Sequence, residues 1–154
     1  MKPKKLTKDT FNPEAFTFID LGLSSGRLWA AENAPDFYTF DEAVDTFGEL
    51  LPRGSVMVEL FEECKSAWND EKKGLDITGP NGNSIFLPAA GYIGDWDHPN
   101  VITNGDEGNY WTRMPYGKNL ARYLYFFSGG VFPLNDYHRP FGFSVRPCRE
   151  SDKE

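Results

Sequence analysis

The chain has 154 residues, enough for one domain with a sizeable core, and 16% of them are aromatic, which excludes a disordered composition. Its net charge of −7 argues against non-specific nucleic-acid binding, which needs a basic surface. No apolar run approaches the roughly 18 residues of a membrane span, so we expect no membrane insertion.

Residues 1–15 contain four lysines and two breaks at proline, and we interpret them as a flexible or docking N-terminal arm. They lack the apolar run of a signal peptide, so we expect a cytosolic product unless another route exports it. Residues 16–20 alternate as in a β-strand, and the turn at residues 24–26 predicts a hairpin with the next strand. We interpret residues 151–154 as a disordered tail.

Residues 38–50 predict a helix. Thr39 can cap its start, and Glu42, three residues further on, completes a capping box. Gly48 is a typical helix stop. The apolar face of this helix would consist of Phe40, Val44 and Phe47.

Residues 52–68 predict a second helix, capped by Ser55. Its buried side would consist of Val58, Leu60, Phe61 and Cys64, with Met57 beside them. After Gly74 the pattern changes to strands and turns, and residues 81–83 (NGN) predict a tight turn between two strands.

The aromatic-rich stretches at residues 109–116, 121–136 and 141–148 predict strands separated by Gly and Pro. This order, with helices early and strands late, predicts an α+β domain over residues 16–150. The residues that we expect in its core are Trp29, Phe86, Trp111, Phe143 and Val145.

Several stretches resemble one known family. "IDLGLSSGRLWA", "LPRGSVMVELFEEC", "TGPNGNSIFLPAAGY", "NYWTRMPY", "YLYFFSGGV" and "GFSVRPC" are similar, in the same order, to motifs of the FISUMP family (Fibrobacter succinogenes major paralogous domain). The resemblance covers residues 18–149. It implies a C-type-lectin-like fold, with two early helices and a small irregular antiparallel sheet that presents a loop-built face.

The chain departs from that family at its cysteines. Glu32 stands where the family often has a cysteine, which removes the partner that the resemblance implies for Cys64. Cys148 stands where the family has valine. We therefore expect Cys64 and Cys148 to be reduced and unpaired, as is usual in a reducing compartment.

The sequence favours neither a metal nor a cofactor. The triplet at residues 68–70 (WND) occurs in calcium-dependent lectins, but here it lacks the loop that precedes it there. The segment 94–108 supplies enough oxygen ligands for calcium, but its spacing does not fit an EF-hand loop. We interpret the segment as a recognition or solvent-exposed loop. Its oxygen-bearing residues are Asp95, Asp97, Asn100, Asn104, Asp106 and Glu107.

The last third of the chain is the candidate ligand face. The resemblance implies this role, because the same region is the diversified face of related retroelement proteins. Arg and aromatic side chains are frequent anchors of protein interfaces. We expect the positions of this region that do not match the scaffold residues of the family to gather, with Tyr116 beside them, on one exposed face of the sheet and its loops. They are Arg113, Tyr116, Lys118, Asn119, Arg122, Phe132, Asn135, Asp136 and His138.

These observations predict a non-enzymatic ligand-binding or structural module. We expect a phage or prophage virion component, with other virion proteins bound by the arm and a protein or glycan of a cell surface bound by the ligand face. The first alternative is a secreted or cell-surface adhesin. The second is an enzyme of the formylglycine-generating type, which needs a reactive cysteine pair, but no catalytic motif is present.

Overall fold

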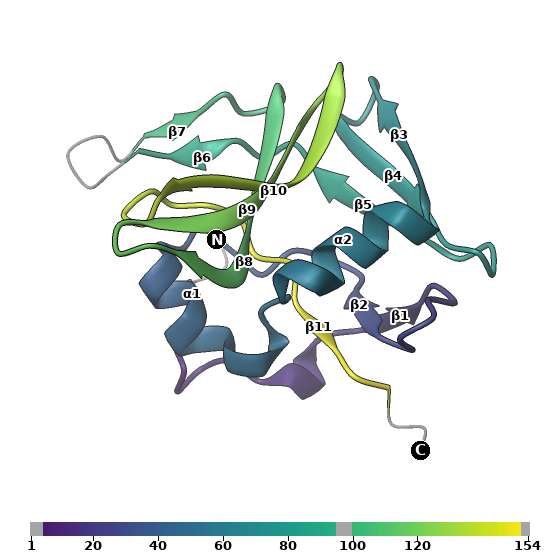
Figure 1. Ribbon diagram of the computed structural model, residues 1–154, viewed down its shortest axis with the longest axis horizontal. Coiled ribbons are helices and arrows are strands. Elements are labelled where there is room, and N and C mark those ends of the chain that lie inside the picture. The colour runs from purple at the N-terminus through teal and green to yellow at the C-terminus, as the bar shows by residue number, and fades with distance from the viewer. Residues whose placement is uncertain (1–4, 95–99, 152–154) are drawn as a thin grey trace.

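The chain has a mixed α+β fold in its computed structural model, which describes residues 5–94 and 100–151. The described residues form two short α-helices and several small antiparallel sheets (Figure 1). The α+β class predicted from the sequence is confirmed. Residues 152–154 of the expected tail lie outside the described residues.

The two ends of the domain meet in one sheet. β1 (Phe18–Asp20) and β2 (Leu28–Ala30) form the predicted antiparallel hairpin, and β11 (Cys148–Arg149) pairs with the other edge of β2. The predicted strand at residues 141–148 is therefore mostly wrong. Phe143 bridges Tyr38, whereas Ser144 bridges Tyr110. Among the described residues, this stretch therefore makes only isolated bridges and has no continuous partner strand.

Helix α1 (Phe40–Phe47) begins as its sequence predicts. The Glu42 amide donates to Thr39 Oγ1 at 3.2 Å, and the Thr39 amide donates to Glu42 Oε1 at 2.9 Å, which completes the capping box. Gly48 ends the helix with a positive φ of 52°. The prediction of a buried Val44 is wrong, because Ala43 takes the core position and Val44 is 39% exposed. A 3-10 turn, η2 (Gly48–Leu50), follows.

Helix α2 (Gly54–Glu63) is shorter than predicted. Arg53, not Ser55, occupies the N-cap position, and Cys64 is already extended, so the chain leaves the helix there. The buried side consists of Val56, Met57 and Leu60. Val58 and Phe61 were predicted on the buried side but are only half-buried. The buried side of α2 is therefore rotated by part of a turn from the predicted one.

A sheet of β3 (Lys65–Asn69), β4 (Gly74–Thr78) and β5 (Ser84–Pro88) follows, with the predicted turn between β4 and β5. Phe86 was expected in the core and is half-buried. Ile85 and Leu87 face the core instead, and alternation turns Phe86 to the other side, where the Lys72 ammonium lies 5.3 Å from its ring centre.

The Trp68–Asp70 triplet is used within this sheet and its turn. Asp70 Oδ1 accepts hydrogen bonds from Trp68 Nε1 at 3.3 Å and from Lys73 Nζ at 2.8 Å. These bonds lower the pKa of Asp70, that from Lys73 most. The triplet therefore has a structural use here.

The largest sheet has the order β10-β9-β8 and consists of β8 (Glu107–Tyr116), β9 (Leu120–Phe127) and β10 (Gly130–His138). The short pair β6 (Tyr92–Ile93) and β7 (Val101–Ile102) lies beside it (Figure 1). Both pairings of β9 contain a register shift, one opposite residues 112–114 and one opposite residues 133–134.

This sheet separates two hydrophobic clusters. On one face, Tyr110, Leu124 and Phe126 pack with α2 and the β3-β4-β5 sheet. On the other face, Trp111 and Tyr123 pack with Phe143 and residues of α1. The expected core positions Trp29, Trp111, Phe143 and Val145 are confirmed, since each is at most 1% exposed.

A buried arginine ties the segment after Phe143 to the rest of the domain. Arg146 is 2% exposed, and burial lowers its pKa. Its guanidinium donates to Asn33 Oδ1 at 2.8 Å, to the Ala30 carbonyl at 2.9 Å and to the Phe86 carbonyl. Because each nitrogen has an acceptor, the cost of burying the charge is offset.

The described part of the expected N-terminal arm, residues 5–15, packs on the domain. Lys5 Nζ lies 2.7 Å from Glu42 Oε1, and the Leu6 amide donates to the Tyr38 hydroxyl at 3.1 Å. The Phe11 ring contacts Phe47 edge to face at 4.8 Å. Over these residues a free arm is not observed, and the expected virion partner of the arm stays a prediction.

Both cysteines are free and buried. Burial raises the pKa of the Cys64 thiol to about 11 and that of the Cys148 thiol to about 12, so both are protonated at neutral pH. Within the described ranges, neither helix has the length and apolar character that crossing a bilayer requires.

Candidate ligand-binding site

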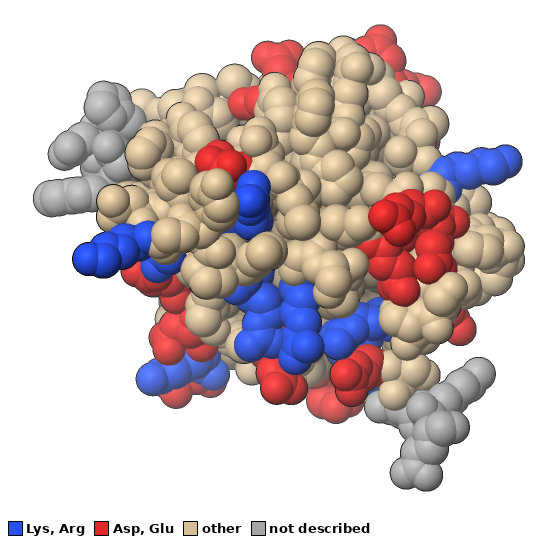
Figure 2. Space-filling view, viewed as in Figure 1, with Lys and Arg blue, Asp and Glu red and all other residues tan. Residues whose placement is uncertain are grey.

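The predicted ligand residues do not share one face of the β8-β9-β10 sheet. Tyr116, Arg122 and Asp136 lie on the face that also packs on α2, which we call the paired face. The Arg122 guanidinium carbon lies 3.9 Å from the Tyr116 ring centre, and Arg122 Nη1 lies 3.3 Å from Asp136 Oδ2. Figure 2 shows one basic and one acidic group close together over β9 and β10 in a largely uncharged area.

Phe132 and Asn135 lie on the opposite face, which we call the pocket face. Phe132 pairs with Tyr125 and Asn135 with Tyr123, so their side chains point the same way as those tyrosines. Asp136 follows Asn135 directly and points the other way. The expectation of a single polar face is therefore wrong, because neighbouring strand residues alternate and the bulge at residues 133–134 shifts the register.

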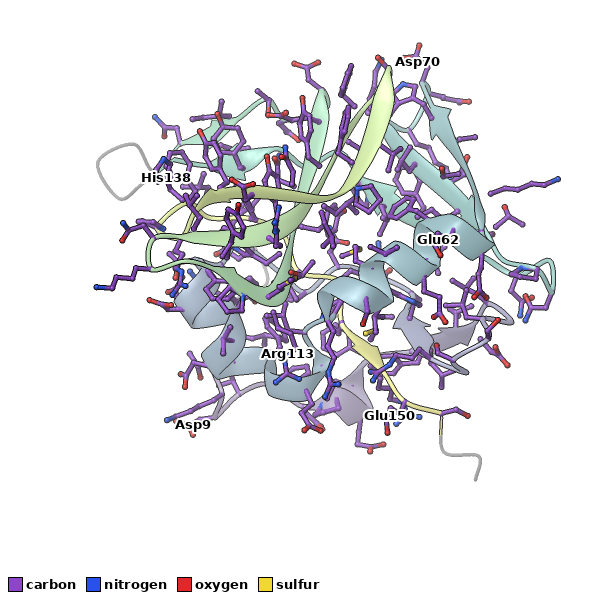
Figure 3. All side chains as sticks on the ribbon, in the orientation of Figure 1. Asp9, Glu62, Asp70, Arg113, His138 and Glu150 are labelled. Carbon is purple, nitrogen blue, oxygen red and sulfur yellow. The ribbon has the colours of Figure 1, made fainter. Side chains whose placement is uncertain are left out.

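The remaining predicted residues lie at the sheet end and beyond it. Lys118, Asn119 and His138 line an open hollow of about 580 Å³ beside Asp41 and Phe141. Arg113 lies well away from His138 (Figure 3), and its amide donates to the Pro52 carbonyl at 2.8 Å. Arg113 therefore does not join the other predicted residues.

A smaller cavity on the pocket face combines aromatic rings with two polar side chains. Its volume is about 210 Å³. Tyr92 contributes from β6, Tyr137 from β10, and Phe143 forms the floor with 1% of its surface exposed. We call this cavity the tyrosine pocket, and its described lining is Tyr92, Glu107, Asn109, Tyr123, Tyr125, Tyr137 and Phe143.

Strand alternation places these side chains together. Glu107 and Asn109 are two residues apart on β8, as are Tyr123 and Tyr125 on β9, and Asn109 pairs directly with Tyr125. The lining thus combines residues of the consecutive strands β8, β9 and β10 with Tyr92 of β6 and with Phe143, which follows β10. Tyr92 reaches it because Gly91 bridges Gly108 in parallel, which brings β6 against β8.

Glu107 is the acidic group of the tyrosine pocket. Its Oε1 accepts a hydrogen bond from Thr103 Oγ1 at 2.9 Å. The Tyr125 side chain also hydrogen-bonds to Glu107. Burial is the largest cause that raises the pKa of Tyr125, and Glu107 raises it further. Within the described residues, no Lys or Arg lies within ion-pair distance of Glu107.

Asn109 supplies an unused donor. The residue is 3% exposed, and its Nδ2 has no hydrogen-bond partner among the described residues. A buried amide without a partner costs about 1–3 kcal/mol, so such groups are rare unless a ligand or water satisfies them. Asn109 lines the tyrosine pocket, so an oxygen of a ligand bound there is a candidate acceptor for this donor.

Tyr92, Tyr123 and Tyr125 keep their protons at neutral pH. Burial is the largest cause that raises the pKa of Tyr92, Tyr123 and Tyr125, and the charge of Glu107 acts in the same direction on each. Asn135 hydrogen-bonds to Tyr123, so one predicted ligand residue touches the lining of the pocket. The pocket therefore offers aromatic faces, hydroxyl groups, one amide donor and one carboxylate.

Sequence reasoning missed most of this pocket. It placed Glu107 in a loop with possible cation ligands and assigned Tyr123 and Tyr125 to the family scaffold. The signal that points to the pocket is the alternation of polar and aromatic residues on neighbouring strands, Glu107 with Asn109 and Tyr123 with Tyr125.

The structure offers no metal centre in the part of the chain that it describes, where no group of three His, Cys, Asp or Glu side chains is close enough to hold an ion. Asp95 and Asp97 lie outside the described residues. Larger hollows of about 560 and 620 Å³ occur near residues 15–35 and 20–27, but their described lining contains no buried polar side-chain atom that lacks a partner.

Comparison with known proteins adds no assignment to this site. No family model, curated protein or solved structure matches the chain. The relation to the FISUMP family stays a prediction from the sequence motifs, and the site is argued from its own geometry.

Proposed function

We propose that this protein is a non-enzymatic binding module whose ligand site is the tyrosine pocket. The observation that carries the proposal is the buried amide nitrogen of Asn109, which has no hydrogen-bond partner among the described residues and belongs to a side chain that lines a cavity of about 210 Å³. Phe132 extends the site, because it is 49% exposed and its ring stacks on Tyr125 at 5.9 Å. Exposed aromatic rings beside a concave site are typical binding anchors.

We propose further that the fold is C-type-lectin-like. The motifs shared with the FISUMP family support this assignment. So does the arrangement of the described elements, in which both ends of the domain pair in one sheet and two helices precede the large irregular sheet. An experimental structure in which the chain order of the β10-β9-β8 sheet differs would contradict it.

For the biological setting we propose a phage or prophage virion, which is the expectation from the sequence. Mass spectrometry of purified virions and of the host envelope fraction tests it, and the protein should be enriched in the virions. Enrichment in the envelope would favour the adhesin alternative.

The burial and raised pKa of Cys148 support a non-enzymatic module over an enzyme with a reactive cysteine pair.

The binding proposal is tested with two matched substitutions. Tyr125→Leu removes a ring of the pocket but keeps apolar bulk in the strand, and Tyr116→Leu makes the same change on the paired face. Binding is measured on arrays of glycans and of host envelope fragments. Wild type and Tyr116→Leu should bind alike, and Tyr125→Leu should bind about fivefold more weakly or worse.

Thermal unfolding of each variant shows whether it is folded before its binding is compared. Equal binding by wild type, Tyr116→Leu and a folded Tyr125→Leu would contradict the assignment of the site to the pocket face. Loss in Tyr116→Leu alone would move the site to the paired face.

A further inference from the structure

The tyrosine pocket has a negative electrostatic character. Glu107 is its only ionisable carboxylate in the described lining, and no described Lys or Arg pairs with it. After burial, the charge of Glu107 helps to raise the pKa of Tyr92, Tyr123 and Tyr125, and Tyr137 acts in the same direction on Tyr92 and Tyr123. Glu107 is half-buried, and its described hydrogen-bond partners are hydroxyl groups rather than a cation, so this carboxylate is suited to meet a cation.

The aromatic rings that line the pocket differ in orientation. The Tyr123 ring makes an angle of 59° with Tyr137 and of 51° with Tyr125, and Tyr92 meets Phe143 at 84°. Ring faces carry partial negative charge and attract cations placed over them. Four tyrosines and Phe143 line one small space together with a carboxylate, which is the composition of a cage for a positively charged group.

We propose that the tyrosine pocket binds an organic ammonium group, with the aromatic rings around it, Glu107 as its counter-ion and Asn109 as donor to a neighbouring ligand oxygen. This inference rests on the proposed binding function. It names the chemistry of the ligand, which comes from one of two sources. One is a free quaternary ammonium compound, and the other is a lysine side chain of a partner protein.

The size and polarity of the pocket favour this ligand over others. At about 210 Å³ the cavity is smaller than the roughly 300–1,000 Å³ of sites for whole drug-sized molecules, so it suits a single head group. An anionic group would be repelled by Glu107. A neutral sugar would leave the Glu107 charge without a counter-ion, and it therefore serves as the alternative in the test.

The first experiment compares choline with 3,3-dimethylbutan-1-ol, a neutral molecule of the same shape, by calorimetric titration of the full chain. Choline carries both an ammonium group and a hydroxyl oxygen that can accept from Asn109. We expect choline to bind at least about tenfold more tightly than its neutral counterpart, because only the cation gains from the rings and from Glu107. Equal affinities would overturn the inference.

Two variants test the role of Glu107. Glu107→Gln keeps the acceptor for Thr103 but removes the charge, and it should weaken choline binding at least about fivefold while leaving the neutral molecule unaffected. Glu62→Gln makes the same change of charge at an exposed residue of α2 (Figure 3), which packs on the paired face, and should bind choline like wild type. Equal losses in both variants would overturn the inference.

A second pair of probes separates the two sources of the ammonium group. Nα-acetyl-lysine methylamide and its trimethyl-lysine form represent a protein side chain. Tighter binding of either than of choline assigns the site to a partner protein, and tighter binding of choline assigns it to a small molecule. Either result supports the ammonium site.

The outcome also distinguishes this inference from the proposed function. If choline and the lysine probes fail to bind but a neutral glycan binds in a way that depends on Tyr125, the binding module stands and the ammonium inference is wrong. If no probe binds and no array signal depends on Tyr125, both are wrong.

Discussion

The two faces of the β8-β9-β10 sheet use charge in opposite ways. On the paired face, Arg122 lies between Asp136 and the Tyr116 ring, so its charge is already matched by groups of the same sheet. On the pocket face, Glu107 has hydroxyl partners but no described cation within ion-pair distance. The same strands thus carry one face on which opposite charges pair with each other and one face on which the carboxylate has no described cation as a partner.

This difference shows why exposure and polarity alone are poor guides to a site. Arg122 and Asp136 have the residue types of an interface anchor, yet they already interact with each other. The less conspicuous Asn109 is almost fully buried and has an unused donor. An unsatisfied group at a cavity is the stronger indication of a ligand.

The largest expected effect on stability comes from truncating Trp111, which packs against Phe143 of the tyrosine pocket. Trp111 is fully buried, stacks on Phe143 at 4.2 Å and donates to the Tyr38 carbonyl at 2.8 Å. Trp111→Ala should lower the free energy of unfolding by about 3–5 kcal/mol, because it leaves a cavity and removes one of the two hydrogen bonds that the Tyr38 carbonyl accepts. Chemical denaturation at neutral pH measures this. A melting temperature within about two degrees of wild type would contradict it.

High pH should weaken both faces together. Burial raises the pKa of Tyr110, behind the paired face, to about 12, and raises that of Tyr123 on the pocket face as well. Because each folded-state pKa lies above the unfolded value of about 10, their contribution to stability is complete below pH 10. It is lost as the pH rises through the folded-state values.

Denaturation curves measured from pH 8 to pH 12 check this prediction. Stability should change little up to about pH 9, because the raised pKa values of Cys64, about 11, and Cys148, about 12, lie above those of the unfolded thiols. Above about pH 9 the contribution of the thiols begins to be lost, and above about pH 10 the tyrosines make the fall steeper. A curve that is flat to pH 12 would show that these groups ionise as easily in the folded protein as in the unfolded chain.

Short-range patterns predicted the local structure well. The capping box of Thr39 and Glu42 and the strand hairpins depend on residues a few positions apart, and each is present. The end of α2 was predicted too late, because the helical pattern continues beyond Cys64. Residues 65–69 instead pair with β4, a competition that involves a partner strand and is not visible in the local pattern.

The site was predicted less well for the same physical reason. Two register shifts, at residues 112–114 and 133–134, change which face each later residue occupies. The alternation of the sequence therefore does not show that Asn135 and Asp136 fall on the pocket face and the paired face respectively. The tyrosine pocket also draws on Tyr92 and Phe143, which only the tertiary structure brings together.

A smaller effect on binding sharpens the comparison of the faces. Phe132→Ala on the pocket face should weaken ligand binding by about 1 kcal/mol, because its exposed ring extends the aromatic surface of Tyr125. Stability should hardly change, since half of the ring is already exposed. Met114→Ala, another change of an exposed apolar side chain of the sheet, is the control for binding. Equal losses for both variants would mean that Phe132 has no special place in the site.

The smallest expected effect concerns the Arg122–Asp136 pair on the paired face. The pair is separated by 3.3 Å, and its side chains are 26% and 36% exposed, so solvent screens the attraction. A double-mutant cycle with Arg122→Gln and Asp136→Asn should give a coupling energy below about 1 kcal/mol, reduced further by high salt.

Each variant should bind ligand like wild type, because the two residues pair with each other on the face away from the pocket. A coupling energy well above that bound would show that the pair is more than a screened surface contact. Loss of binding in either single variant would show that the two faces act together, and the contrast between a matched face and an open one would then be wrong.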